Sequence, residues 1–383
     1  MDKRQKVTDK NARYPARNIM SETGYDKHIL FPVLLLVGIG IVMVYSASSA
    51  VAMTKFGSDF FFLRKQALFA VAGISLLVLC RHIPYKFYWH LTYPILIGSM
   101  LLLVAIHIPG VGYKAGGATR WISFAGYTFQ PAELARIALI FFLAYSLSKK
   151  RENVREFSIG FFPHIFVLAI FSVLLHLQPD FGTILIFGII TWIMMFIAGV
   201  PLKYLAAPLI LILPLMGYLM IEAPYRLERI LTFYDPWQYA QCSGYQVIHS
   251  LMAFGSGGLF GAGIGQGYQK LFYLPESHTD FIFSVIGEEL GLLGVICILA
   301  LYLWVIWRGL AIARKTENVY GSLVASGITL AFALQVCINM GVALGLLPTK
   351  GLTLPFISYG GTSLLVNMAA MGVLMNIGSS ERI

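Results

Sequence analysis

The feature that most restricts the possible folds of this chain is a series of long apolar runs. An α-helix needs about 20 consecutive apolar residues to cross the hydrocarbon core of a bilayer. Only 12% of the residues are charged, about half of the share that is usual in soluble domains. The sequence therefore predicts an all-α, polytopic membrane protein, with one domain of about ten transmembrane helices over residues 28–383. The predicted spans are about 28–50, 62–81, 89–108, 131–148, 161–177, 180–198, 202–222, 280–307, 320–346 and 355–377.

Basic residues are concentrated in the N-terminal tail and in alternate loops. The tail, residues 1–27, is polar and rich in Lys and Arg, and we expect it to be disordered. It could touch anionic lipid, or it could serve as a topology signal only. By the positive-inside rule, both termini are expected to be cytoplasmic, and the loops 109–130, 223–278 and 347–354 face outward. The net charge of +10 does not indicate nucleic acid as a partner, because the basic residues lie beside apolar spans.

The longest predicted loop, 223–278, separates the seventh and eighth spans. It contains many glycines, but they lack the spacing of a nucleotide-binding motif, and we expect no organic cofactor. Its aromatic and apolar residues argue against disorder. We expect short helices that lie at the outer membrane interface.

The stretch from Tyr273 to Gly291 combines polar loop residues with the start of an apolar span, and Asp280 stands where the two meet. A carboxylate at the mouth of a span needs partners or water, so it is a functional candidate. Ser277 and Asp280 are also spaced as a capping pair, which would make Asp280 structural. A helix N-terminus would lower the pKa of Asp280 and burial would raise it. Structural, partnered roles suit Glu288 and Glu289 at least as well as chemistry does.

Further charged residues mark the predicted outer ends of other spans. Gln130, Glu133 and Arg136 share one helix face, where Glu133 and Arg136 could neutralise each other towards the bundle. Alternatively, Arg136 faces an outer cavity and an anionic substrate. Lys350, between prolines and beside Gly351, could extend to the interface or hold a phosphate. Arg120 is a similar candidate.

Several motifs resemble one known family in order along the chain. They are Gly117-Ala-Thr-Arg-Trp-Ile122, Gln130-Pro-Ala-Glu-Leu134, Gln178-Pro-Asp-Phe-Gly182, Ser243-Gly-Tyr-Gln246, Tyr273 to Gly291 and Leu347 to Ser363. They are similar to those of the SEDS family (shape, elongation, division and sporulation), and most similar to its cell-division branch. The resemblance implies a peptidoglycan glycosyltransferase that polymerises lipid II at the outer face of the bacterial cytoplasmic membrane.

The resemblance also implies roles for single residues and for partners. Asp280 falls on the proposed catalytic residue of the family, and it could also bind a metal; a divalent cation, Mg or Mn, is expected. Candidates for substrate binding are Arg120, Gln130, Glu133, Arg136, His278, Thr279, Lys350 and Ser363. The family often has Lys where this chain has Arg136. The implied partners are a class B penicillin-binding protein, a transpeptidase with a single transmembrane helix, and other divisome or elongasome membrane proteins. The alternatives are a lipid II flippase or a non-catalytic division scaffold.

Overall fold

The computed structural model describes residues 25–115, 118–124, 126–208, 210, 214, 217 and 224–380. Eight described helices are long and apolar enough to cross a membrane. They are α1 (Lys27–Phe56), α2 (Phe61–His82), α3 (Tyr85–Ala105), α4 (Pro131–Lys149), α5 (Phe162–His176, with the π-helical turn Phe157–Phe161 before it), α10 (Ile282–Lys315), α11 (Val319–Ala343) and α12 (Gly361–Ser380). A shorter apolar helix, α6, covers Phe181–Ile197. Residues 1–24 of the predicted tail 1–27, and most of the predicted span 202–222, lie outside the described residues.

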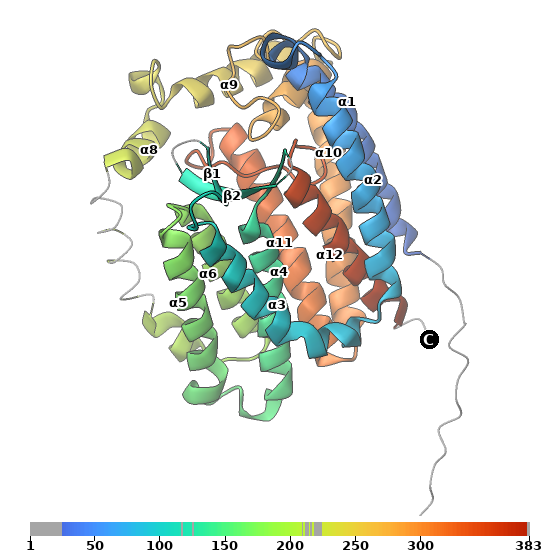
Figure 1. Ribbon diagram of the computed structural model, residues 1–383, viewed down its shortest axis with the longest axis vertical. Coiled ribbons are helices and arrows are strands. Elements are labelled where there is room, and N and C mark those ends of the chain that lie inside the picture. Colours follow the sequence, from blue (N-terminus) through green and yellow to red (C-terminus); the bar gives the residue numbers. More distant parts are fainter. Residues whose placement is uncertain are drawn as a thin grey trace, which may run out of the picture.

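The long helices run side by side as one bundle (Figure 1), which confirms the predicted helical, polytopic architecture. Helix α1 begins and α12 ends at the same end of the bundle, which we call the termini end. There Arg308 of α10 forms an ion pair with Asp26, 2.7 Å between Nη2 and Oδ2. Asn376 of α12 accepts a hydrogen bond from the backbone N–H of Tyr85 and donates one to the carbonyl of Arg81, both 2.8 Å.

Three helices form the centre of the bundle. In their most apolar stretches, 72% of the α4 residues, 61% of those in α11 and 78% of those in α12 are buried, against 22% in α2 and in α3. Small residues make this packing possible, because a Cβ at Gly327 of α11 would stand 2.6 Å from Ile140. Helices α2 and α3 instead turn apolar side chains such as Val71 and Leu101 outward, as expected of a surface in contact with lipid.

The opposite end of the bundle, which we call the loop end, contains β-structure as well as helices. Residues of the loop 109–130 form a three-stranded antiparallel sheet, with β1 (Gly112–Ala115), β2 (Ala118–Phe124) and β3 (Tyr127–Phe129) in the order β1-β2-β3. The sequence analysis did not predict this sheet. Tyr113, Thr119, Trp121 and Ile122 favour strands, and the sheet places Arg120 on β2.

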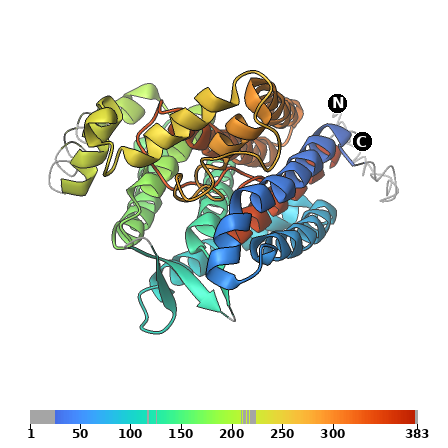
Figure 2. The same cartoon turned by 90° about the horizontal axis from the view of Figure 1, so that it is seen from above.

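The long loop before α10 contains the short helices that were predicted. Helix α8 covers Pro224–Tyr234, a 3-10 turn covers Trp237–Tyr239, and α9 covers Tyr245–Gly257. Seen from above, α9 lies across the loop end and the sheet lies at its rim (Figure 2). Several predicted boundaries were wrong: α1 ends at Phe56 instead of about 50, α10 ends at Lys315 instead of about 307, and α12 begins at Gly361 instead of about 355. Residues 355–360 form turns instead of helix, as expected of a stretch that contains Pro355 and Gly360.

Candidate active site

Asp280 lies in a tight turn just before α10. The backbone N–H groups of Thr279, Asp280 and Phe281 are each 3.2 Å from the carbonyl oxygen of Glu276. Glu276 itself has a positive φ of 53°. The predicted capping pair of Ser277 and Asp280 is therefore wrong, because the helix has not begun there and Ser277 Oγ donates to the carbonyl of Ala47 on α1.

The backbone around Asp280 is fixed by the loop that joins α11 to α12. Asn339 Nδ2, on α11, donates to the carbonyl of Asp280 at 2.9 Å and to that of Leu352 at 2.5 Å. Ser358 Oγ donates to the carbonyl of Thr279 at 2.5 Å and accepts from the N–H of Leu354 at 2.8 Å. These two side chains hold the Asp280 turn and the 350–358 segment in one register. The sequence analysis did not single out Asn339 or Ser358 as residues of the site.

The carboxylate of Asp280 faces Gly351. A Cβ at Gly351 would stand 2.9 Å from Asp280 Oδ2, so only glycine leaves the carboxylate its place. Among the described residues, none donates a hydrogen bond to this carboxylate. Burial, and then the neighbouring charge of Glu276, raise the pKa of Asp280 to about 7, while Arg120 opposes this rise. Burial is therefore the largest influence on this carboxyl, and it raises the pKa.

Lys350 lies in the same loop, one residue before Gly351. Its side chain crosses the first turn of α6, where a Cβ at Gly182 would stand 1.8 Å from Cε and 2.5 Å from Nζ. The Nζ atom is buried without a hydrogen-bond partner in the described part of the chain. Burial lowers the pKa of Lys350 to about 8, although Asp180 and Glu133 favour the charged form. A buried ammonium with unused donors is suited to an anionic ligand.

Arg120 connects the sheet to the α5–α6 turn. Its Nε donates to the carbonyl of Gln178 at 3.3 Å and its Nη2 to that of Pro179 at 2.6 Å. Its charge acts on both Asp280 and Lys350, so the structure brings these three sequence-predicted residues together. Asp180 caps α6 through Thr183, as its position after Pro179 suggested.

Arg136 lies in a polar network inside the bundle. Its Nη2 is 2.8 Å from Glu133 Oε2, and its Nη1 donates to Gln335 Oε1 at 2.6 Å. Nη2 also donates to Asn367 Oδ1 at 3.2 Å, and Gln335 Nε2 donates to Ser363 Oγ at 3.1 Å. Glu133 and Arg136 therefore adopt the bundle-facing arrangement. Arg136 and Glu133 still act on Lys350 through their charges.

The remaining predicted residues make contacts of their own, and His278 Nδ1 is buried without a hydrogen-bond partner in the described part of the chain. His278 packs against the rings of Phe62 and Tyr359, at centroid distances of 4.7 and 5.8 Å, and these two rings also contact each other. Burial lowers the pKa of His278. Thr279 Oγ1 donates to Glu276 Oε2 at 2.9 Å. Gln130 begins α4, where its N–H donates to Thr362 Oγ1 at 3.1 Å.

Glu288 and Glu289 have structural partners. Glu289 accepts a hydrogen bond from Ser46 Oγ at 2.7 Å and pairs with Lys270, 2.5 Å from Nζ. Glu288 accepts from the N–H groups of Tyr268 and Gln269 at 2.8 and 3.2 Å. Both carboxylates thus bind the end of the long loop to α10. This leaves Asp280 as the carboxylate of the predicted stretch that faces Gly351, the residue after Lys350, and that is influenced by the charge of Arg120.

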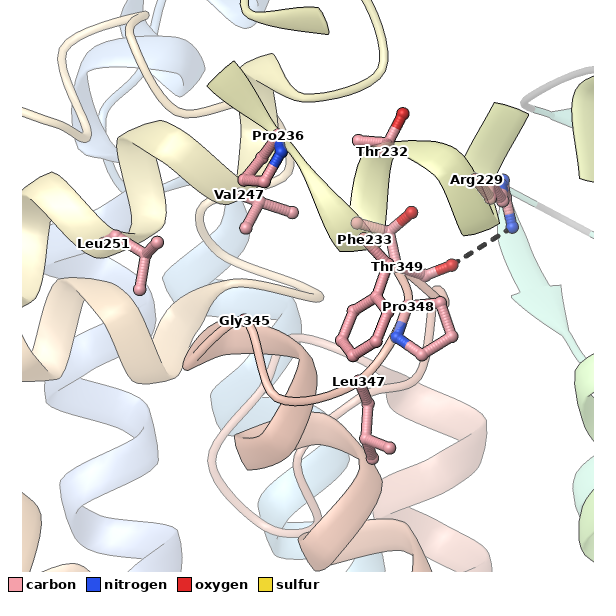
Figure 3. Close-up of a pocket in the computed structure, with 10 residues that line it drawn as sticks. All are labelled: Arg229, Thr232, Phe233, Pro236, Val247, Leu251, Gly345, Leu347, Pro348 and Thr349. Carbon is pink, nitrogen blue, oxygen red and sulfur yellow. Dashed lines mark hydrogen bonds between the residues drawn. The ribbon is translucent and has the colours of Figure 1, made fainter. Parts of the chain in front are cut away.

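A small cavity of about 110 Å³ lies next to the Lys350 loop (Figure 3). Apolar residues of α8, α9 and the 345–349 segment line it, among them Phe233, Leu251 and Leu347. Arg229 Nη1 donates across it to the carbonyl of Thr349 at 3.3 Å. The contact connects α8 to the residue before Lys350, while Asp280 and Lys350 lie outside the cavity lining.

The sequence and the fold are similar to those of one family. The profile of the FtsW/RodA/SpoVE cell cycle proteins matches residues 27–383. The chain is 46% identical over 362 residues to the probable peptidoglycan glycosyltransferase FtsW of Geobacter metallireducens, covering 94% of this chain and 96% of the relative. It is 40% identical over 363 residues to the stage V sporulation protein E of Bacillus subtilis, with 94% and 99% covered.

Solved structures agree with the sequence relatives. A chain from a peptidoglycan synthase complex that coordinates polymerisation and crosslinking superposes with a TM-score of 0.79 at 29% identity, over 94% of this chain and 99% of that one. The rod shape determining protein RodA of Thermus thermophilus gives a TM-score of 0.70 at 29% identity, with the same coverage. The family resemblance found in the motifs is confirmed, and the chain belongs to the FtsW/RodA/SpoVE family of cell cycle proteins.

Proposed function

We propose that this chain is a peptidoglycan glycosyltransferase that polymerises lipid II, with Asp280 as its general base. The observation that carries the proposal is the pairing of two unusual groups on adjoining loops. Asp280 has a pKa of about 7 and no hydrogen-bond donor among the described residues. Lys350 has a buried, unpartnered ammonium nearby. A base with a pKa near the working pH is the efficient choice for proton transfer.

The reaction needs both groups at once. The acceptor sugar hydroxyl gives its proton to the Asp280 carboxylate while its oxygen forms a bond to the anomeric carbon of the donor. The bond from that carbon to the pyrophosphate oxygen breaks, and the electron pair leaves with undecaprenyl pyrophosphate. Lys350 and Arg120 offset the negative charge that grows on this leaving group.

A divalent cation could bind near Asp280 only if the substrate supplied some of its ligands. Among the described residues, no group of three or more His, Cys, Asp or Glu side chains could hold a metal ion. Mg²⁺ often binds through one or two carboxylates together with substrate phosphates, and Asp280 and Glu276 lie near enough for their charges to interact. We infer that a cation, where used, is bound together with the pyrophosphate.

The position of the site also supports an orientation of the protein in the membrane, and a solved relative supports a partner protein. The loop end would face outward and both termini would be cytoplasmic, in keeping with the basic residues of the termini-end loop 149–155. One solved relative belongs to a complex of polymerisation and crosslinking. This supports a class B penicillin-binding protein, a transpeptidase, as the partner of this chain.

A flippase is less well supported, because the charged candidates gather at the loop end. A transport site is expected near the bilayer midplane, on discontinuous helices with access from both sides. Asp280, Lys350 and Arg120 all lie in loops or on the sheet beyond the helix ends.

The test is polymerisation of labelled lipid II by the purified protein. We expect Asp280→Asn to lower the rate by at least about a hundredfold, the range typical of a lost general base. Asp59→Asn is the matched control, because Asp59 also lies at the loop end and bonds only to Tyr45 among the described contacts. Near-normal polymer from a folded Asp280→Asn protein would exclude Asp280 as the base and favour a transporter or scaffold.

A further inference from the structure

Helix α10 is broken at Gly291, where φ is 64° and ψ is −166°. In a regular helix, the N–H groups of Leu292 and Leu293 would donate to the carbonyls of Glu288 and Glu289. Here they donate to the carbonyls of Gly258 and Leu259, at 2.9 and 3.2 Å. The long loop therefore replaces the partners that the helix break removes.

The exchange is reciprocal. The carbonyls of Glu288 and Glu289 accept hydrogen bonds from the N–H groups of Ala262 and Gly263, at 2.9 and 3.0 Å. The backbones approach so closely that a Cβ at Gly261 would stand 2.2 Å from the carbonyl oxygen of Glu289. Four backbone groups of α10 are thus satisfied by residues 258–263, the segment that directly follows α9.

The position of the break along α10 sets its depth. Two exposed tryptophans, Trp304 and Trp307, mark the termini end of the helix, next to the Arg308 ion pair. Tryptophans are enriched at the membrane interface. A hydrocarbon core of about 30 Å corresponds to about 20 helical residues, which reaches from about residue 307 to about residue 287. The break at 288–293 therefore lies within the hydrocarbon layer, near its edge at the loop end.

The segment that closes the break is apolar throughout. Residues 258–264 read Gly-Leu-Phe-Gly-Ala-Gly-Ile, with no polar side chain. Leu259, Phe260 and Ile264 are 61%, 80% and 59% exposed, and the neighbouring Leu292 and Leu293 of α10 are 47% and 56% exposed. The loop and the helix share one continuous apolar surface. Non-helical backbone is tolerated at membrane depth where it is buried in protein, and here the N–H groups of Ala262 and Gly263 and the carbonyls of Gly258 and Leu259 face α10 and pair with it.

We propose that residues 258–264 form a re-entrant turn, embedded in the acyl layer of the bilayer, whose partner is lipid acyl chains. Leu259, Phe260 and Ile264 point into lipid, and Glu288 and Glu289 anchor the following residues at the layer's edge. The turn would fix the height of α10, and hence of Asp280, relative to the membrane surface.

The test is depth measurement in bilayers. The three exposed native cysteines, Cys242, Cys297 and Cys337, are replaced by alanine, and single cysteines are introduced by Phe260→Cys, Leu293→Cys and Gln241→Cys. Each variant carries an environment-sensitive fluorophore and is placed in phosphatidylcholine vesicles. We expect acyl-brominated lipid to quench position 260 within twofold of position 293, and aqueous iodide to quench position 241 at least fivefold more than position 260.

Two results would overturn the proposal. Iodide quenching at position 260 equal to that at position 241 would show that the turn lies in water. Iodide quenching at position 260 that disappears only when a penicillin-binding protein is added would make the surface a protein docking site. Phe260 is exposed in the fold, so the cysteine should not disturb it, and lipid II polymerisation by each variant confirms folding.

Discussion

Asp280→Asn should stabilise the folded protein at pH 8 while it abolishes polymerisation. Asp280 is partly buried, and the described residues offer its carboxylate no hydrogen-bond donor. Its ionised form is therefore destabilised in the fold, which is why its pKa rises from 3.8 to about 7. The asparagine is neutral at every pH, so it removes this penalty and keeps the shape of the side chain.

The magnitude follows from proton linkage. The folded carboxyl keeps its proton up to about pH 7, whereas the unfolded one loses it near pH 3.8. Wild-type stability consequently falls as the pH rises from about 4 to about 7 and is then level. At 1.36 kcal/mol per pH unit, the advantage of Asp280→Asn is at most about 4 kcal/mol at pH 8 and about 2 kcal/mol at pH 5.

The assay is denaturation of the detergent-solubilised protein at both pH values, followed by tryptophan fluorescence. Asp180→Asn is the control with the opposite expectation, because Asp180 accepts hydrogen bonds from the N–H and Oγ1 of Thr183. It should leave stability unchanged or lower it. The reasoning is refuted if Asp280→Asn is no more stable than wild type at pH 8, since the carboxylate would then be well solvated.

Three further predictions concern the same site. The rate of polymerisation should be bell-shaped in pH, falling about tenfold per unit well below the Asp280 pKa of about 7 and again well above the Lys350 pKa of about 8; a flat profile from pH 5.5 to 9 contradicts this pairing. Asn339→Ala leaves the carbonyls of Asp280 and Leu352 without their donor, so kcat should fall more than KM rises, with a stability loss of about 1–3 kcal/mol; an equal loss from Asn339→Asp, which keeps the shape but not the donor, supports the hydrogen bonds as the cause. Gly182→Ala should displace the Lys350 side chain and raise the KM for lipid II, whereas Gly188→Ala on the same helix, with nothing within 4 Å of the new Cβ, should not; equal KM values for the two would show that Lys350 does not bind the substrate.

The helices could be predicted from the sequence because hydropathy over about 20 residues is a strong signal. The described helices of the bundle coincide with predicted spans, but some of their ends do not, such as Phe56 of α1, Lys315 of α10 and Gly361 of α12. Shorter features gave no comparable signal. The strands β1 to β3 are three to seven residues long, and the break at Gly291 sits inside an apolar run, where a glycine is common in membrane helices.

The charged residues of the candidate site could be predicted from the sequence, but the residues that hold them in position could not. Asp280, Lys350 and Arg120 could be singled out because ionisable residues are expensive beside a span. Their separation in sequence gives no distance between them. Asn339 and Ser358 could not be recognised as the residues that fix the Asp280 turn, because an amide and a hydroxyl in apolar spans have many structural uses. Gly182 and Gly351 could not be recognised either, because their importance depends on the close approach of a side chain from another part of the chain.

The α11–α12 connection carries the main consequence for mechanism. It supplies Lys350, the glycine that faces the Asp280 carboxylate, and Ser358, which binds the carbonyl of Thr279. This one loop therefore contains Lys350 and contacts the turn of the proposed base, Asp280, so a movement of the loop would shift both relative to α6. Arg229 of α8 contacts Thr349 in that loop, while α10 is joined to the segment after α9 at its break. A movement of the long loop could therefore reach the site through two contacts, one leading to Lys350 and one to Asp280. We expect the reaction to change only if the movement alters the position of Asp280 relative to Lys350.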